Sequence, residues 1–213
     1  MNDPIEQRFK NVSNSKTFSN IVFRHDLRKK RVLDLGCSYG EFLAHFGAGS
    51  VGITISEGEA EYGKNRGLNT RIGNAENTLP FVGEFDVIFA NNLLEHLYAP
   101  HEFLCTIKKY LKPEGFLILG VPCIPIIFPL LRLKKFQGSL ADAHINFFTK
   151  NTLRKTVERA GWDIGDIRGF HFATRFFDKL LDPIYPHFYV TASVQEHFEY
   201  PEKRMKDLRG YAR

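Results

Sequence analysis

Residues 32–42 read VLDLGCSYGEF and combine a short apolar segment, one carboxylate and a glycine turn. The turn runs from Gly36 to Gly40, after Asp34 and before a helix-like run. A buried strand that ends in such a turn at a helix N-terminus directs free backbone N–H groups to one place, and glycine allows a ligand to approach closely. The pattern therefore predicts a ligand site, with a glycine spacing that differs from the G-x-G-x-x-G of dinucleotide sites.

The elements that position this turn follow from alternating apolar and amphipathic segments. Strands are expected at 31–36, 50–55, 69–73, 84–90, 114–121, 162–170 and 187–194, and helices at 40–47, 57–66, 100–111, 149–160 and 172–181. This alternation favours an α/β fold with a doubly wound, mostly parallel sheet and helices on both faces. Thr149 is expected to cap its helix and Gly161 to end it, while residues 112–115, KPEG, are expected to form a turn.

The 213 residues are expected to form a single domain. Its parts are a polar, partly helical leader over 1–30, a core over 31–121, an insert over 122–148, the rest of the sheet over 149–194 and a basic tail over 195–213. The insert has three prolines in its first half, which excludes a regular helix there. We expect a lid whose apolar residues face a substrate pocket. The alternative is contact with a membrane surface through residues 124–135.

Composition limits the other possibilities. Hydrophobic residues make up 43% of the chain, enough for a sizeable core. Cys37, Cys105 and Cys123 form neither a zinc nor a disulfide pattern, and the first residues are polar, so a cytoplasmic protein is expected. The net charge of +5 is concentrated in residues 24–31 and 202–213, and we expect no nucleic-acid partner. No oligomeric state is predicted.

Four segments, in this order, resemble the class I S-adenosylmethionine-dependent methyltransferases, in particular their small-molecule group of types 11 and 23. They are DLGCSYG, GNAENTLPFVGEFDVIFANNLLEHLYAP, KYLKPEGFLILGVP and HINFFTKNTLRKTVERAGWDI, and together they span about residues 31–168. The resemblance implies a Rossmann-like sheet of seven strands with an antiparallel last strand. It also implies S-adenosyl-L-methionine as the cofactor and methyl transfer as the activity.

The resemblance further implies which residues bind the cofactor. They lie in the glycine turn and after the second, third and fourth strands: Asp34, Gly36, Cys37, Ser38, Tyr39, Gly40, Thr54, Ile55, Ser56, Asn74, Ala75, Glu76, Asn91 and Asn92. The family usually has an acid where Thr54 stands, and a hydroxyl binds a ribose diol less strongly than a carboxylate does. Ser56 or Glu57 could compensate. In the other interpretation, Thr54 is there for β propensity and Ser56 is a helix cap.

Four of these expectations are specific. Asp34 accepts N–H groups of the turn and holds the amino group of the cofactor, directly or through water. Asn74, at a position where the family usually has Asp, accepts the adenine amino group through its carboxamide oxygen. Ala75 presents its backbone N–H to a ring nitrogen, and Glu76 is exposed beside it.

His96, in the segment LLEHL, is the first candidate for a general base, because the resemblance places it near the transferred methyl group. A histidine with a pKa of about 6.5 accepts a proton at neutral pH. His144 is the second candidate, since INFFT is expected to lie over the carboxyl edge of the sheet. The alternative for each is a structural histidine, and Glu95 is expected to hold the turn or pair with a cation. No metal site is expected, and His187 is expected to be a surface or core residue.

The favoured function is methylation of an apolar or amphiphilic small molecule, with O-methylation preferred because a hydroxyl would have to lose a proton near His96. Methyl transfer itself needs alignment of donor and acceptor rather than a base. The substitutions at Thr54 and Asn74 favour an alternative, an inactive methyltransferase-like scaffold that binds a partner or a membrane. An NAD-dependent oxidoreductase is disfavoured by the glycine spacing and by the lack of an acid at Thr54.

Overall fold

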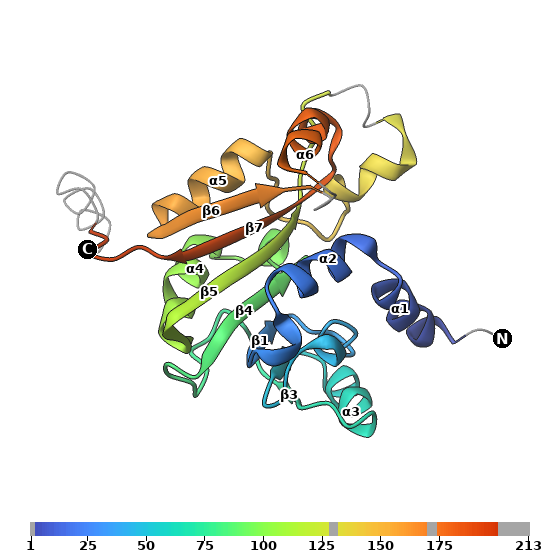
Figure 1. Cartoon of the computed structure of the whole chain (residues 1–213). Coiled ribbons are helices and arrows are strands. Elements are labelled where there is room, and N and C mark those ends of the chain that lie inside the picture. Colours follow the sequence, from blue (N-terminus) through green and yellow to red (C-terminus); the bar gives the residue numbers. More distant parts are fainter. Residues whose placement is uncertain (1–2, 128–131, 170–173, 200–213) are drawn as a thin grey trace.

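The computed structural model describes residues 3–127, 132–169 and 174–199 (Figure 1). Within these residues, seven strands form one sheet in the order β3-β2-β1-β4-β5-β7-β6. The strands are β1 Val32–Leu35, β2 Val51–Thr54, β3 Thr70–Ile72, β4 Phe85–Asn91, β5 Leu111–Pro122, β6 Trp162–Arg168 and β7 His187–Val194. β1 to β5 are parallel, and β7 runs antiparallel to both β5 and β6. The predicted Rossmann-like sheet with an antiparallel last strand is confirmed.

Helices flank this sheet. They are α1 Pro4–Ser13, α2 Lys16–Arg24, α3 Glu57–Asn65, α4 Pro100–Thr106, α5 Lys150–Arg159 and α6 Arg175–Leu181. The predicted start of α5 is confirmed, because the Thr149 side chain accepts the Thr152 amide, and Gly161 follows the helix with φ +77. The helix predicted over 100–111 is shorter, since a 3-10 segment, Ile107–Tyr110, follows α4 and Leu111 opens β5.

The core has two parts, one on each face of the sheet. Successive strand side chains point to opposite faces: Leu33 packs in the larger cluster with α4 and α5, whereas Val32 packs in the other cluster with α2. Phe18, Ile21 and Val22 supply the apolar side of α2 at the spacing of helical turns. Figure 1 shows α2 in front of the strands and α4 behind them. The helical part of the predicted leader therefore belongs to the packed structure.

The helix predicted over 40–47 is wrong. These residues form turns and a short 3-10 segment, Leu43–His45. Gly47 stops the helix, because its amide donates to the carbonyls of Leu27 and Lys30. A Cβ on Gly47 would lie 2.6 Å from Lys30 O, so this glycine is required where two backbone segments meet.

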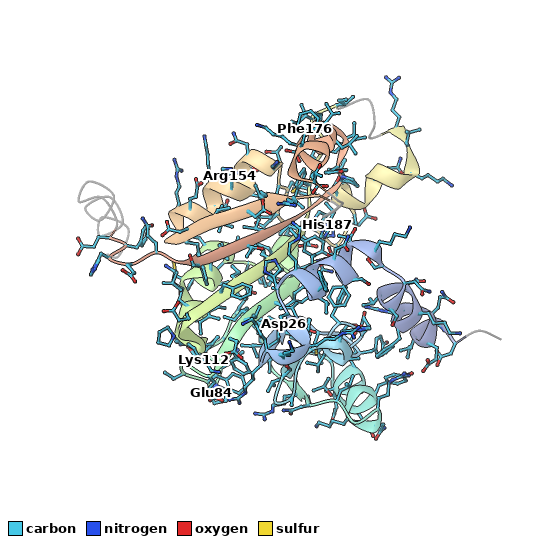
Figure 2. The ribbon with its side chains drawn as sticks, in the orientation of Figure 1. Asp26, Glu84, Lys112, Arg154, Phe176 and His187 are labelled. Carbon is cyan, nitrogen blue, oxygen red and sulfur yellow. The ribbon has the colours of Figure 1, made fainter. Side chains whose placement is uncertain are left out.

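The turn predicted at residues 112–115 is instead a bulge within β5. Phe85 pairs with Leu111 and Val87 pairs with Phe116, so residues 112–115 face a single residue of β4, Asp86. The Lys112 ammonium donates to Asp86 Oδ1 at 2.7 Å. Figure 2 shows Lys112 at the end of the sheet away from His187, so this bulge is remote from the carboxyl edge where β5 meets β7.

Candidate functional site

The glycine turn after β1 is held by a carbonyl of β2. The amides of Gly36 and Cys37 both donate to Ile53 O at 2.9 Å, so the prediction that the turn's amides are free is wrong for these two. Gly36 has φ +75 and Ser38 has φ +49. Within the described part of the chain, the amides of Ser38 and Tyr39 donate to no backbone carbonyl. These are therefore the N–H groups that the turn offers to a ligand.

The side chain of Cys37 points into the core rather than toward a ligand. Gly52 of β2 leaves room for it, since a Cβ on Gly52 would lie 2.7 Å from Cys37 Sγ. Burial raises the pKa of the Cys37 thiol far above its usual range, so the thiol is unreactive. Gly40, with φ +90, closes the turn by donating its amide to Cys37 O at 2.9 Å.

Two carboxylates are buried beside the turn. Arg8 of α1 donates to Glu41 Oε1 through Nε at 2.9 Å, and its guanidinium lies 5.2 Å from the centre of the Tyr39 ring. Burial and the nearby Glu41 charge raise the pKa of Asp34 well above its usual range, against a hydrogen bond from the Leu43 amide. Asp34 Oδ2 has no hydrogen-bond partner among the described residues. A buried oxygen of this kind needs a donor, such as an amino group of a ligand that lies on the turn.

The end of β2 brings three polar side chains together. The Thr54 hydroxyl donates to Glu59 Oε2 at 2.5 Å, and the Ser38 hydroxyl donates to Glu59 Oε1 at 3.0 Å. Sequence reasoning missed Glu59, which lies in the first turn of α3, and considered Ser56 and Glu57. Ser56 accepts the Glu59 amide and caps α3, and Glu57 is exposed. The S-x-x-E spacing of Ser56 and Glu59 is itself typical of a helix start, which concealed any other role.

The loop after β3 differs in part from expectation. Asn74 is exposed, and its Oδ1 accepts the Glu76 amide at 2.9 Å, which leaves one lone pair for a ligand. The side chain of Ala75 packs in the larger core cluster. Glu76 was expected to be exposed, but it is half-buried and its carboxylate accepts the Ala99 amide at 2.8 Å, at the start of α4. Ile55, beside this loop, is exposed.

β4 delivers Asn91 and Asn92 to the carboxyl edge, where β7 adds His187 (Figure 2). Asn92 has φ +52, donates its amide to Gly120 O at 2.9 Å, and places Oδ1 2.9 Å from His187 Nε2. Asn91 Oδ1 is buried and packs over Gly120, where a Cβ would collide with it. Shielding from water lowers the pKa of His187 to about 4, so its ring is neutral at pH 7.

His187 was expected to be a surface or core residue, and its place at the edge was missed. It pairs with Pro122 across two antiparallel strands that are far apart in the sequence. No spacing in the sequence signals such a neighbour, because the pairing depends on β7 entering the sheet between β5 and β6.

The turn after β4 and the insert bring two histidines to one carboxylate. Glu95 Oε1 lies 3.9 Å from Nε2 of His96 and 3.9 Å from Nε2 of His144. Nδ1 of His96 lies 2.9 Å from Ala143 O, and Nδ1 of His144 lies 3.5 Å from Ser139 O. A carbonyl only accepts, so each Nδ1 carries a proton, and in the neutral ring Nε2 has a lone pair on the side of Glu95. We call Glu95, His96 and His144 the edge cluster.

The segment that follows His144 is hydrogen-bonded to the turn after β4. The amides of Ile145 and Asn146 donate to Glu95 O at 2.9 and 3.0 Å, and Asn146 Nδ2 donates to Leu97 O at 2.6 Å. The prediction that INFFT lies over the carboxyl edge is confirmed. These bonds fix the position of His144 relative to His96.

Other parts of the insert depart from the prediction of an inward-facing lid. Ile126, Leu133 and Leu140 are exposed, and residues 128–131 of this prediction lie outside the described residues. Ser139 is buried and faces the edge cluster. In the described part of the chain, no helix is long and apolar enough to cross a membrane.

A pocket opens over the edge cluster. Its lining comes from the turn after β4, the insert and the start of β7: Asn92, Glu95, His96, Pro122, Gly138, Ser139, His144, Pro186 and His187. Burial raises the pKa of Glu95 to about 7, and both carboxylate oxygens lack a hydrogen-bond partner within the described residues. The carboxyl group therefore titrates near neutral pH between two imidazoles, an arrangement suited to taking up or holding a proton.

The edge cluster also has the donor set of a cation site, which sequence reasoning did not anticipate. One carboxylate oxygen and two ring nitrogens lie within 4.8 Å of one another. Two imidazoles and a carboxylate suit Zn²⁺ or a similar divalent ion. The carbonyls that accept from Nδ1 orient both rings, as the surrounding groups of metal sites commonly do.

The comparisons with known proteins agree with this architecture. A family model described as "Methyltransferase domain" matches residues 7–166. Among curated proteins, the mitochondrial ubiquinone biosynthesis O-methyltransferase of Schizosaccharomyces pombe is 28% identical over 159 residues, which are 66% of this chain and 57% of that protein. The ubiquinone biosynthesis O-methyltransferase of Coxiella burnetii is 32% identical over 161 residues, which are 68% of this chain and 69% of that protein.

Solved structures share the fold at lower identity. An S-adenosylmethionine-dependent methyltransferase of Thermotoga maritima aligns with a TM-score of 0.63 and 17% identity, over 90% of this chain and 95% of that one. One from Archaeoglobus fulgidus aligns with a TM-score of 0.62 and 18% identity, over 89% and 99%.

Proposed function

This chain belongs to the methyltransferase domain family and uses S-adenosylmethionine, and from this premise we propose that it methylates a hydroxyl group of a small molecule bound over the edge cluster. The observation that carries the proposal is the convergence of two imidazole Nε2 atoms on a buried carboxylate beside the pocket, one that accepts no hydrogen bond from the described residues. The names of the two curated relatives also point to methylation of oxygen.

In such a reaction the chain binds the methyl donor and activates the acceptor. S-Adenosylmethionine supplies the electrophilic methyl group when it is bound. The amides of Ser38 and Tyr39 and Oδ2 of Asp34, which lack backbone or side-chain partners within the described residues, would hold and orient it at the glycine turn. The turn lies next to the loop after β4, since a Cβ on Gly36 would meet the Leu93 side chain at 3.2 Å. Cofactor and acceptor would therefore occupy adjoining parts of the carboxyl edge.

The edge cluster would remove the proton from the acceptor hydroxyl. His96 donates Nδ1–H to Ala143 O, so Nε2 is the basic atom. His144 is oriented in the same way by Ser139 O. The Glu95 carboxylate, 3.9 Å from Nε2 of His96, would then stabilise the imidazolium by its opposite charge. Proton removal by a positioned side chain typically contributes about 10²–10⁴-fold to a rate.

A divalent cation is the second candidate for this step, favoured by the spacing of the three donor atoms. Held by Glu95, His96 and His144, it would bind the acceptor oxygen and lower the pKa of the hydroxyl group. Both candidates assign the activation of the acceptor to the same three side chains. Turnover after removal of metal by a chelator separates them, because a histidine base keeps working and a cation site does not.

The acceptor is proposed to be apolar or amphiphilic. Pro122, Gly138 and Pro186 line the pocket over the edge cluster beside its polar side chains. Such apolar lining favours an acceptor that carries an apolar body next to its hydroxyl group.

The test is an acceptor screen with methyl-labelled S-adenosylmethionine and matched phenols, catechols, amines and thiols of similar size. We expect label on oxygen in phenols or catechols, together with one S-adenosylhomocysteine for each product. Label on nitrogen or sulfur alone would overturn the assignment to oxygen while leaving the family assignment intact.

A further inference from the structure

Glu59 occupies an unusual place for a helix residue. It is the third residue of α3, and Ser56 caps that helix by accepting the Glu59 amide at 3.3 Å. In a capping box, the side chain of this residue would return to the amide of the cap. Here the Ser56 amide donates to the Thr54 hydroxyl at 3.3 Å instead. The Glu59 carboxylate is therefore not used to start its own helix.

The Glu59 carboxylate instead bridges the ends of two neighbouring strands, β1 and β2. One oxygen accepts the hydroxyl of Ser38, in the glycine turn after β1, and the other accepts the hydroxyl of Thr54, the last residue of β2. A carboxylate has about four acceptor positions, so each oxygen keeps a lone pair after these bonds. Glu59 is half-buried, which leaves the group accessible to a ligand that lies on the turn.

The Glu59 carboxylate thus lies beside the end of β2, the place where sheets of this type hold the ribose of a nucleotide. An acid about 20 residues beyond the glycine turn, at the end of the second strand, accepts the ribose hydroxyls. Thr54 lies at that strand end, and its side chain carries no charge. We propose that Glu59 provides the missing carboxylate from α3 and accepts the ribose hydroxyls of S-adenosylmethionine, with Thr54 and Ser38 as the residues that position it.

The surroundings favour a nucleoside rather than a purely structural bridge. Ile55 follows Thr54 directly, and Ile72 pairs with Thr54 across β2 and β3; both side chains are exposed. An apolar surface beside a carboxylate suits a base beside a ribose diol. One of the two hydroxyls that hold Glu59 is that of Ser38, in the turn whose Ser38 and Tyr39 amides donate to no backbone carbonyl of the described residues, so carboxylate and amides would act on one ligand.

The experiment compares two ligands on matched variants by calorimetry. S-Adenosylhomocysteine and its 2′,3′-dideoxy analogue differ only in the ribose hydroxyls. The wild type should bind S-adenosylhomocysteine about 10–100 times more tightly than the analogue, the range typical for hydrogen bonds to a charged group. In Glu59→Gln, S-adenosylhomocysteine should lose at least about tenfold in affinity, and the analogue should bind as before.

Two further variants sharpen the test. Thr54→Asp combined with Glu59→Ala returns an acid to the strand end and should restore the preference for the hydroxylated ligand. Glu57→Gln, an exposed acid of the same helix, should change neither affinity. Glu59→Gln keeps the shape of the side chain, and its melting temperature shows whether the turn is intact.

The inference is overturned if Glu59→Gln weakens both ligands equally or neither, or if the wild type does not distinguish them. It rests on S-adenosylmethionine as the cofactor and not on the acceptor. Failure of the proposed O-methylation would appear only in the acceptor screen, whereas failure here appears in binding without any acceptor.

Discussion

Arg8 of α1 donates through Nε to the buried carboxylate of Glu41 at 2.9 Å, across 33 positions of the sequence. The same guanidinium lies over the Tyr39 ring. In the same helix, Glu6 accepts the Tyr62 hydroxyl of α3 at 3.0 Å. These contacts fasten the first helix over the glycine turn and make the start of the chain part of the candidate cofactor site.

Removal of Arg8 should therefore destabilise the protein. In Arg8→Leu, Glu41 stays buried without its partner, and we expect the free energy of unfolding to fall by about 1–3 kcal/mol. The double variant Arg8→Leu/Glu41→Gln removes the unpaired charge as well and should recover most of this loss. Urea unfolding of the single and double variants measures both; strictly additive losses would show that the pair is not coupled.

The contact between Gly52 and Cys37 gives a second prediction, for packing under the turn. Gly52→Ala places a methyl group 2.7 Å from Cys37 Sγ and should cost about 1–3 kcal/mol of stability through overpacking. Cys37→Ala removes the sulfur and should relieve part of that cost in the double variant. Thermal unfolding of the four proteins is the measurement, and the absence of any rescue would place the strain elsewhere, for example at Leu43.

The raised pKa of Glu95 predicts that the stability of the protein depends on pH. Burial raises its pKa from 4.5 to about 7, so between these values the folded state holds a proton that the unfolded state has released. The free energy of unfolding should therefore fall as the pH rises from about 4.5 to 7, by up to about 3 kcal/mol. Glu95→Gln should remove this fall and be more stable than the wild type at pH 8, while its turnover drops. Urea unfolding of metal-free protein at pH 5 and pH 8 checks the sign; equal pH dependence in both proteins would contradict it.

The fold was largely predictable because its signals are local. The glycine turn, the apolar strands and the cap at Thr149 are short patterns in the sequence, and each appears in the structure. The exceptions depend on distant contacts. At the end of the segment predicted as a helix over 40–47, Gly47 meets the backbone of Lys30. In the segment predicted as a turn over 112–115, the Lys112 side chain donates to Asp86 of β4.

The candidate site was predictable only in outline. His96 and His144 come together as two neighbours of Glu95. Glu95 was predicted only to hold the turn or pair with a cation, because nothing local shows that its carboxylate is buried. Glu59 was hidden by a helix-start pattern, and His187 reaches the edge only through the placement of β7. The contact of His144 with Glu95 and the place of His187 join distant segments, whereas Thr54 and Glu59 are close in the sequence and their contact depends on how α3 follows β2.

The loss of an acid at Thr54 and Asn74 had favoured an inactive scaffold as the alternative. The structure weakens that argument, since Glu59 brings a carboxylate to Thr54 and Asn74 keeps an acceptor position on its carboxamide. The family assignment and these two contacts support an active enzyme.

The most direct measurement is single-turnover methyl transfer to the best hydroxyl acceptor, in the wild type and in His96→Ala, with saturating S-adenosylmethionine. Both proteins should bind the cofactor equally, because His96 lies in the edge cluster and not at the glycine turn. We expect transfer in His96→Ala to be slower by about 10²-fold or more. Equal rates would contradict activation of the acceptor by the edge cluster and would leave the protein to work by alignment of donor and acceptor alone.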